Sequence, residues 1–233
     1  MRERKTLSSY KLAVLISGSG SNLQAVLDAI NDGRINKAEV ALVVSNRAGA
    51  YGLERAKKHD IPTMVIDKSN TSELLSALNA YEIDGIVLAG YLSILPPEII
   101  NIYSGKIINI HPALLPMFGG KGFYGIRVHQ AVLASGVPFS GATVHLVDCG
   151  IDTGAVLVRG VVPVLPDDTA EDLQKRVLMV EHDILVMAVK AMAQSRIEEM
   201  TARPAIFVDE KDKAGVLEFA KGLKELGEAL KGS

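Results

Sequence analysis

The sequence predicts an α/β protein with a Rossmann-like, mostly parallel twisted sheet and helices on both faces. Short apolar runs alternate with amphipathic helical patterns, which is typical of right-handed βαβ units. Polar or glycine-rich segments follow several of these runs, at the edge where open α/β sheets bind ligands. A chain of 233 residues with 48% hydrophobic and 22% charged residues can bury one large core.

Each run has the period expected of its element in the N-terminal half. The strand candidates are short, apolar and rich in β-branched residues, and the helix candidates place apolar residues on one face. The strands are expected over 12–17, 40–45, 63–66, 86–89 and 106–110, and the helices over 22–30, 51–59, 71–81 and 97–103.

The pattern changes after Pro116, where a glycine-rich loop at 119–125 leads into a helix over 127–134. Two runs with alternating residues follow, at 140–147 and 155–164, and a long helix is expected over 170–194. We expect one continuous domain over 11–203. Residues 1–10 are expected to form a disordered tail. Residues 204–233 form an extension with a strand, a turn and an amphipathic docking helix, to which we assign no catalytic role.

Composition and charge indicate a small-molecule ligand. A net charge of −2 gives no global attraction to nucleic acid or anionic lipid, so a phosphate-bearing ligand must be held locally. The single Cys149 excludes an internal disulfide, and no Cys/His cluster has zinc spacing. The N-terminus lacks the apolar stretch of a secretory signal, and no apolar run is long enough to span a bilayer. We expect a metal-free cytoplasmic protein, monomer or homodimer, without nucleic-acid or membrane partners.

A polar amide and an imidazole lie at the end of the expected strand 106–110. Asn109 and His111 are two residues apart, so their side chains leave the same face, and Pro112 fixes the backbone beyond them. Such a pair can hold the oxyanion that forms when a nucleophile attacks a carbonyl. A lone histidine at a strand end is more often structural, so His111 gains a functional interpretation only from the motifs around it.

A glycine-rich turn, Ser17-Gly-Ser-Gly-Ser-Asn22, joins the first expected strand to the first helix. Backbone N–H groups and the helix dipole at such a turn favour an anion. The third glycine of a dinucleotide fingerprint is absent, and so is an acidic ribose ligand after the second strand. We infer that Gly20, Ser21 and Asn22 hold a terminal phosphate monoester. A capped βα turn without a ligand is an equal alternative.

Two further segments are candidates for the site. The apolar side chains of 88–96 could wall a flat aromatic ligand, although a core loop covering the sheet explains their composition more simply. Asp148 and Asp152 lie in a glycine-punctuated loop between two later strands. An aspartate beside His111 would orient its ring and raise its pKa. Spacing leaves either aspartate as the candidate, with a structural turn for the other.

Four co-linear motifs together resemble the phosphoribosylglycinamide formyltransferases. They occupy 16–25, 88–95, 109–116, and 141–145 with 152–154, and the similarity runs from about Lys11 to Arg203. The resemblance implies the formyltransferase fold and a step of de novo purine biosynthesis. The formyl group of the co-substrate 10-formyltetrahydrofolate would pass to the glycyl amine of glycinamide ribonucleotide, giving formylglycinamide ribonucleotide and tetrahydrofolate.

The resemblance also implies residue roles. Asn109, His111 and Asp152 match the family's catalytic residues, whereas Asp148 has no counterpart. In this hypothesis, Asn109 and protonated His111 hold the oxyanion while Asp152 sustains the imidazolium. The substrate-binding residues would be Gly20, Ser21 and Asn22 for the phosphate and Glu181 for the ribose, and the folate-binding residues Leu92, Ser93, Ile94, Leu95 and Asn109.

The chain departs from the family pattern at the folate site. An Arg that many relatives carry before the third helix is missing, and Ser93 stands where many have Arg. Weaker folate binding and compensation by Lys68 and Arg127 are both open. His129 and His145 recur at matching positions, and we interpret His145 as a packing residue. The alternatives are a formyltetrahydrofolate hydrolase, which does not need the phosphate turn, and a catalytically weak nucleotide-binding homologue.

Overall fold

The computed structural model describes residues 9–218 and 221. The strands are β1 (Tyr10–Ile16), β2 (Ala38–Ser45), β3 (Thr63–Val65), β4 (Gly85–Leu88), β5 (Ile107–His111), β6 (Phe139–Leu146), β7 (Val156–Pro163) and β8 (Ala205–Val208). The helices are α1 (Ser21–Asn31), α2 (Tyr51–Lys58), α3 (Thr71–Ala80), α4 (Pro97–Ile102), α5 (Ile126–Ser135), α6 (Ala170–Ala193) and α7 (Ile197–Ala202).

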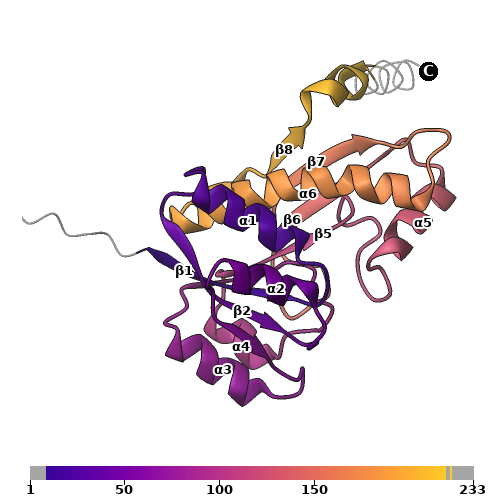
Figure 1. The fold of residues 1–233 in the computed structure, drawn as a ribbon. Coiled ribbons are helices and arrows are strands. Elements are labelled where there is room, and N and C mark those ends of the chain that lie inside the picture. The colour runs from indigo at the N-terminus through magenta and orange to yellow at the C-terminus, as the bar shows by residue number, and fades with distance from the viewer. Residues whose placement is uncertain (1–8, 219–220, 222–233) are drawn as a thin grey trace, which may run out of the picture.

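All eight strands form one sheet in the order β3-β2-β1-β4-β5-β6-β7-β8 (Figure 1). The strands from β3 to β5 are parallel, β6 is antiparallel to both β5 and β7, and β8 is parallel to β7. The predicted α/β class and mostly parallel sheet are therefore confirmed. The parallel half directs the carboxyl ends of β1, β2, β4 and β5 to one edge, where loops can build a ligand site.

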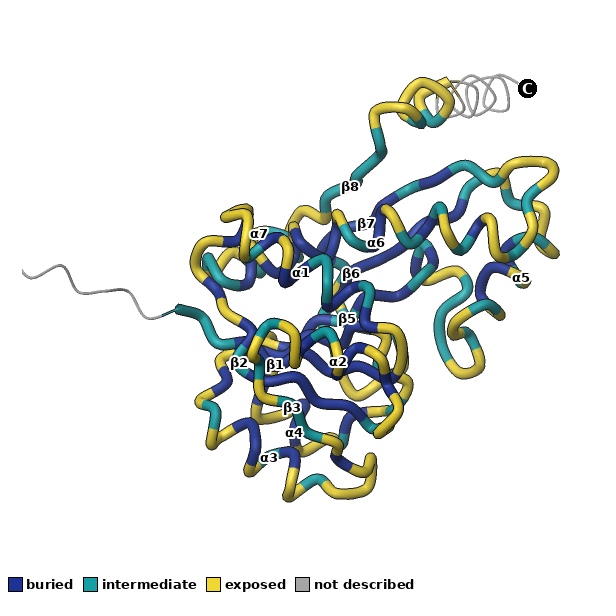
Figure 2. The backbone as a smooth tube through the Cα atoms, in the orientation of Figure 1, coloured by how far each residue is buried: buried dark blue, intermediate teal, exposed yellow. Residues whose placement is uncertain are grey.

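Helices cover both faces of the sheet, so the central strands are buried on both sides (Figure 2). In β1, Leu12, Val14 and Ile16 belong to the core cluster that includes residues of α1 and α6. Ala13 and Leu15 face the opposite cluster, with residues of α3 and α4. A parallel strand buried on both faces needs apolar residues at every position, which explains the continuous apolar run that marked it in the sequence.

The chain ends differ in part from expectation. Tyr10, assigned to the tail, is the first residue of β1, and residues 1–8 lie outside the described part. The strand expected in the extension is β8, which pairs with β7 and so belongs to the same sheet as the other strands. A helix follows over 210–218, and the rest of the extension lies outside the described residues except Lys221. In this described part, no helix is long and apolar enough to cross a membrane.

Strand β8 offers a matched pair for testing whether the extension contributes to stability. Phe207 is partly buried and packs against the core, whereas the neighbouring Ile206 is 71% exposed. We expect Phe207→Ala to lower the free energy of unfolding by about 1–3 kcal/mol, because part of an aromatic side chain leaves the core. Ile206→Ala should stay within about 0.5 kcal/mol of the parent. Urea unfolding of both variants checks this, and equal effects would contradict the packing of β8.

Candidate functional site

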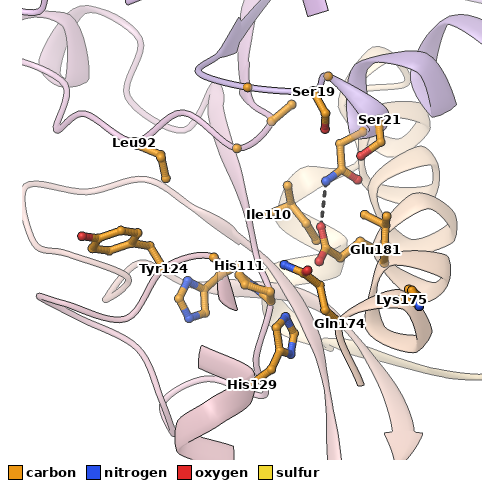
Figure 3. Close-up of a pocket in the computed structure, with 18 of the residues that line it drawn as sticks. Ser19, Ser21, Leu92, Ile110, His111, Tyr124, His129, Gln174, Lys175 and Glu181 are labelled. Carbon is orange, nitrogen blue, oxygen red and sulfur yellow. Dashed lines mark hydrogen bonds between the residues drawn. The ribbon is translucent and has the colours of Figure 1, made fainter. Parts of the chain in front are cut away.

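A cavity of about 410 Å³ opens at the carboxyl edge of the parallel strands (Figure 3). Its wall combines the turn after β1, the end of β5, the loop before α5 and one face of α6. Ser19, Ser21, His111, Tyr124 and Glu181 contribute to this wall. The topology therefore brings segments from distant parts of the sequence to one site.

The turn after β1 is fixed by close backbone packing against α2. Gly20 has a φ of 70°, and a Cβ built on it would lie 2.5 Å from the Cα of Gly52. The Gly52 amide donates to the Gly18 carbonyl at 3.0 Å. Arg55 Nε donates to the Ser19 carbonyl at 2.9 Å. These contacts hold the turn at the N-terminus of α1, where backbone amides and the helix dipole favour an anion.

The four residues assigned to substrate binding all line this cavity: Gly20, Ser21, Asn22 and Glu181. Asn22 Nδ2 donates to Glu181 Oε2 at 2.7 Å, shown by the dashed line in Figure 3. Burial raises the pKa of Glu181, and the hydrogen bond from Asn22 opposes this shift only in part. The pair joins the glycine-rich turn to α6 and presents a carboxyl oxygen that can accept a hydrogen bond from a ligand hydroxyl.

A second, mostly apolar pocket of about 100 Å³ lies on the other side of the loop after β4. Its lining includes Ser93, Ile94 and Leu95, together with Asn109, four of the five residues assigned to folate binding. Leu92 lines the first cavity instead. Short apolar side chains with a few polar groups suit a flat ring system. The residues that line this pocket include no Lys or Arg, in keeping with the Ser that stands in place of the family's Arg.

The Asp152 carboxylate lies close to His111, to His145 and to the Gly120 amide. Its Oδ2 accepts from the Gly120 amide at 2.9 Å and lies 3.5 Å from His111 Nδ1, while Oδ1 lies 3.7 Å from His145 Nε2. The φ of Asp152 is 58°, a left-handed conformation that is uncommon outside glycine and occurs often at functional sites. Burial alone would raise the pKa of Asp152, but the two histidines and the Gly120 amide outweigh burial and lower it.

The choice left open between the two aspartates is decided by these contacts. Asp148 Oδ1 accepts from the Gly150 amide at 2.9 Å and from Thr153 Oγ1 at 2.6 Å, so it stabilises the turn. Asp152, four residues on, is the one that reaches His111. Asp152 and His111 therefore lie close together, which the sequence alone could not establish.

His145 does more than pack, contrary to our expectation. It pairs across the sheet with Asn109, and the Asn109 Nδ2 lies 3.1 Å from His145 Nε2. His145 Nδ1 lies 2.7 Å from the Leu146 carbonyl, which requires a proton on Nδ1 and leaves Nε2 as the acceptor for the amide in the neutral ring. His145 therefore fixes which way the Asn109 amide points. The signal that could have found it is the β5–β6 register, which a single sequence does not contain.

His111 is 4% exposed, and burial has the largest influence on its pKa. Burial lowers its pKa below the ordinary value, and the Asp152 carboxylate opposes this shift without overcoming it. Burial therefore favours the neutral ring in the unliganded protein, a protonation state that the sequence had left open. Nε2 lies 2.8 Å from the Phe118 carbonyl, so the neutral ring carries its proton there, and Nδ1 faces Asp152.

Sequence reasoning gave no role to several other residues that line the first cavity. His129 is buried, and burial together with the nearby His111 lowers its pKa to about 4. Tyr124, from the glycine-rich loop, and Gln174 and Lys175, from α6, border the same space (Figure 3). Among the described residues, no group of three or more His, Cys, Asp or Glu side chains could hold a metal ion.

The structure thus combines a doubly wound α/β sheet with two pockets at its carboxyl edge and with Asn109, His111 and Asp152 where these pockets approach each other. Residues 10–189 match the formyl transferase family. The chain belongs to this family.

The chain is similar to named members of this family. It is 42% identical over 204 residues to the chloroplastic phosphoribosylglycinamide formyltransferase of Vigna unguiculata, covering 84% of this chain and 65% of that one. It thus spans less than two thirds of that relative. Its fold matches glycinamide ribonucleotide transformylase 1 from Symbiobacterium toebii with a TM-score of 0.75 and 39% identity, over 81% of this chain and 89% of that one.

The fold alone does not distinguish reactions within the family. A formyltetrahydrofolate deformylase from Pseudomonas syringae pv. tomato matches with a TM-score of 0.74, over 81% of this chain and 63% of that one, at only 25% identity. The difference in identity, 39% against 25%, therefore carries more information than the nearly equal structural scores.

The contact between Asp152 and His111 can be tested by imidazole titration. Asp152→Asn removes a negative charge that favours the imidazolium, so the pKa of His111 should fall further below its ordinary value. Asp148→Asn is the matched control, because Asp148 is engaged in its own turn and should leave the His111 titration unchanged. NMR titration of the histidine ring protons measures both. A His111 pKa that stays constant or rises in Asp152→Asn would contradict the assigned contact.

The close packing of the glycine-rich turn at residues 17–22 against α2 predicts the effect of one added methyl group. Gly52→Ala would put a Cβ 2.4 Å from Ile16 Cδ1 and 3.1 Å from Gly20 Cα, which displaces α2 or the turn. We expect binding of a phosphate monoester such as ribose 5-phosphate to weaken about tenfold, in line with the usual cost of overpacking. Gly49→Ala meets nothing within 4 Å and serves as the control. Calorimetric titration distinguishes them, and equal affinities would disprove the role of this contact.

Proposed function

We propose that this protein is a phosphoribosylglycinamide formyltransferase, which transfers the formyl group of 10-formyltetrahydrofolate to glycinamide ribonucleotide in purine biosynthesis. The observation that carries the proposal is the position of the Asn109–His145–Asp152–His111 cluster. His111 lines the cavity that contains the phosphate turn, whereas Asn109, His145 and Asp152 line the second pocket. Two substrates bound in these two spaces would meet at the cluster.

The cavity suits the nucleotide. The amides at Gly20, Ser21 and Asn22 would bind its 5′-phosphate, because a helix N-terminus offers unpaired donors. Glu181, joined to Asn22 at 2.7 Å, would accept from a ribose hydroxyl. The glycyl amine would then extend toward His111, and the folate ring would occupy the pocket beside Ile94 and Leu95.

In the proposed reaction, the neutral amine attacks the formyl carbon and the carbonyl electrons move to the formyl oxygen. Because His145 holds one Nδ2 hydrogen of Asn109, the other is available to the developing oxyanion. The Nε2–H of His111, which donates to the Phe118 carbonyl in the unliganded protein, is the second donor. N10 of the folate takes a proton from His111 Nε2 or from water, and the amine proton then replaces the one that was given. The oxyanion electrons re-form the carbonyl as the carbon–N10 bond breaks. The products are the formylated amine and tetrahydrofolate.

The lowered pKa of His111 determines when its charge appears. At neutral pH the unliganded ring is mostly uncharged, because burial outweighs the attraction of Asp152. The imidazolium would form as the oxyanion develops nearby, since two negative charges then face it. Asp152 would therefore stabilise the charged His111 ring mainly in the transition state and less in the resting protein.

The remaining expectations belong to the same proposal. Both ligands are small molecules, with the folate as a co-substrate and without a resident metal. We expect a cytoplasmic location, a monomer or homodimer, and no nucleic-acid partner. Residues 11–203 are proposed to act as the catalytic domain. The extension from residue 204 adds strand β8 to the sheet.

A product assay distinguishes the proposed transferase from its alternatives. The protein is incubated with 10-formyltetrahydrofolate with and without glycinamide ribonucleotide, and formylated nucleotide, formate and tetrahydrofolate are quantified. We expect equal amounts of formylated nucleotide and tetrahydrofolate, and little formate when the amine is omitted. Formate release at the same rate without the amine would establish the hydrolase. Nucleotide binding without either product would establish a binding homologue.

Removing the His111 side chain tests its proposed role. We expect His111→Ala to reduce turnover by about 10²–10³-fold, the usual effect of deleting an oxyanion donor. Circular dichroism should show an unchanged fold. His59→Ala is a matched control at the C-terminus of α2, where His59 contacts Gln24 and lies outside both pockets. Retention of most activity in His111→Ala would contradict the assignment.

A further inference from the structure

Three polar side chains form a continuous hydrogen-bonded chain at the carboxyl edge of the sheet. Ser17 Oγ donates to Asn46 Oδ1 at 2.7 Å, and Asn46 Nδ2 donates to Ser93 Oγ at 2.6 Å. The same Ser17 Oγ accepts from the Leu92 amide at 2.8 Å. Ser17 is only 3% exposed, so its hydrogen bonds are protected from competition with water.

This chain spans three neighbouring strands. Ser17 directly follows β1, Asn46 directly follows β2, and Ser93 belongs to the loop after β4. In the sheet, β1 lies between β2 and β4. The network therefore connects the start of the phosphate turn to the loop 91–95, although residues 17 and 93 are far apart in sequence.

The loop 91–95 is the partition between the two pockets. Leu92 lines the first cavity, whereas Ser93, Ile94 and Leu95 line the second. Apart from the bond between the Leu92 amide and Ser17, the contact between Ser93 and Asn46 holds the loop from its other side. Movement of this loop would therefore displace side chains that line both pockets.

We propose that Ser17, Asn46 and Ser93 are positioning residues that fix this partition and couple the two substrate sites. The identity of the two substrates rests on the function proposed above, but the coupling of the loops does not. A long cationic side chain at position 93 could not replace the compact hydroxyl that accepts from Asn46 without moving one of them. In this chain Ser93 therefore holds the loop through its hydrogen bond with Asn46.

Amide hydrogen exchange tests the network without reference to activity. Ser17→Ala removes the acceptor of the Leu92 amide and the donor to Asn46, and Ser93→Ala removes the acceptor of Asn46 alone. Both should speed exchange in 91–95, by about two- to tenfold in Ser93→Ala, as expected for the loss of one neutral hydrogen bond. Ser93→Thr keeps the hydroxyl and should restore slow exchange. Ser72→Ala is the control, because Ser72 is an exposed residue of α3.

Kinetics then tests what the partition does in the reaction. In Ser93→Ala, KM for the formyl donor should rise about two- to tenfold with a smaller change in kcat, because binding is affected and the Asn109–His111 chemistry is not. Ser93→Thr should recover the parent KM. The double variant Ser17→Ala/Ser93→Ala should raise KM by less than the product of the two single effects, because both substitutions act on one connected network.

The outcomes separate this proposal from the proposed function. Unchanged exchange in 91–95 for Ser93→Ala, or effects of the two substitutions that simply multiply, would overturn the network. Faster exchange in Ser93→Ala that Ser93→Thr reverses, in a parent protein that transfers no formyl group, would retain the network and reject the transferase. An unchanged donor KM in Ser93→Ala of an active parent would remove its role in substrate binding.

Discussion

The rest of the site depends on the contacts that the Asp152 carboxylate makes. This carboxylate lies in the loop between β6 and β7, receives the Gly120 amide from the glycine-rich loop, and faces His111 from β5 and His145 from β6. Three segments are thus held to one side chain that is 12% exposed. The left-handed backbone of Asp152, with a φ of 58°, is the local strain that this arrangement requires.

Burial and charge act in opposite directions around this carboxylate, and their balance differs between its partners. Burial raises the pKa of Asp152, but two imidazoles and one amide reverse the shift, so the group remains ionised. For His111 burial prevails, and the ring is kept mostly neutral despite the adjacent negative charge. The site thereby combines a fixed anion with a mostly neutral histidine, which in the proposed reaction would gain its proton when new negative charge develops beside it. His145 and Asn109 complete this arrangement by fixing the orientation of the amide.

The sequence indicated the parts of this site that depend on local periodicity. Asn109 and His111 could be assigned to one face because a strand alternates its side chains, and the glycine-rich turn could be placed at the start of α1 because it joins a strand to a helix. Spacing could not choose between Asp148 and Asp152, because both lie in one loop and the choice depends on how that loop folds back. His145 was undervalued because its contact with Asn109 depends on the β5–β6 register. Gly52 gave no signal, since its role is a backbone approach from another helix.

A crystal structure with both ligands would test the central claim most directly. The complex would contain glycinamide ribonucleotide and an unreactive analogue of 10-formyltetrahydrofolate that keeps a carbonyl in place of the formyl group. We expect the phosphate at Gly20–Asn22, the folate ring beside Ile94 and Leu95, and the carbonyl oxygen within hydrogen-bond distance of Asn109 Nδ2 and His111 Nε2. A carbonyl oxygen that contacts neither Asn109 nor His111, with the amine directed away from the carbonyl carbon, would contradict transfer at this cluster.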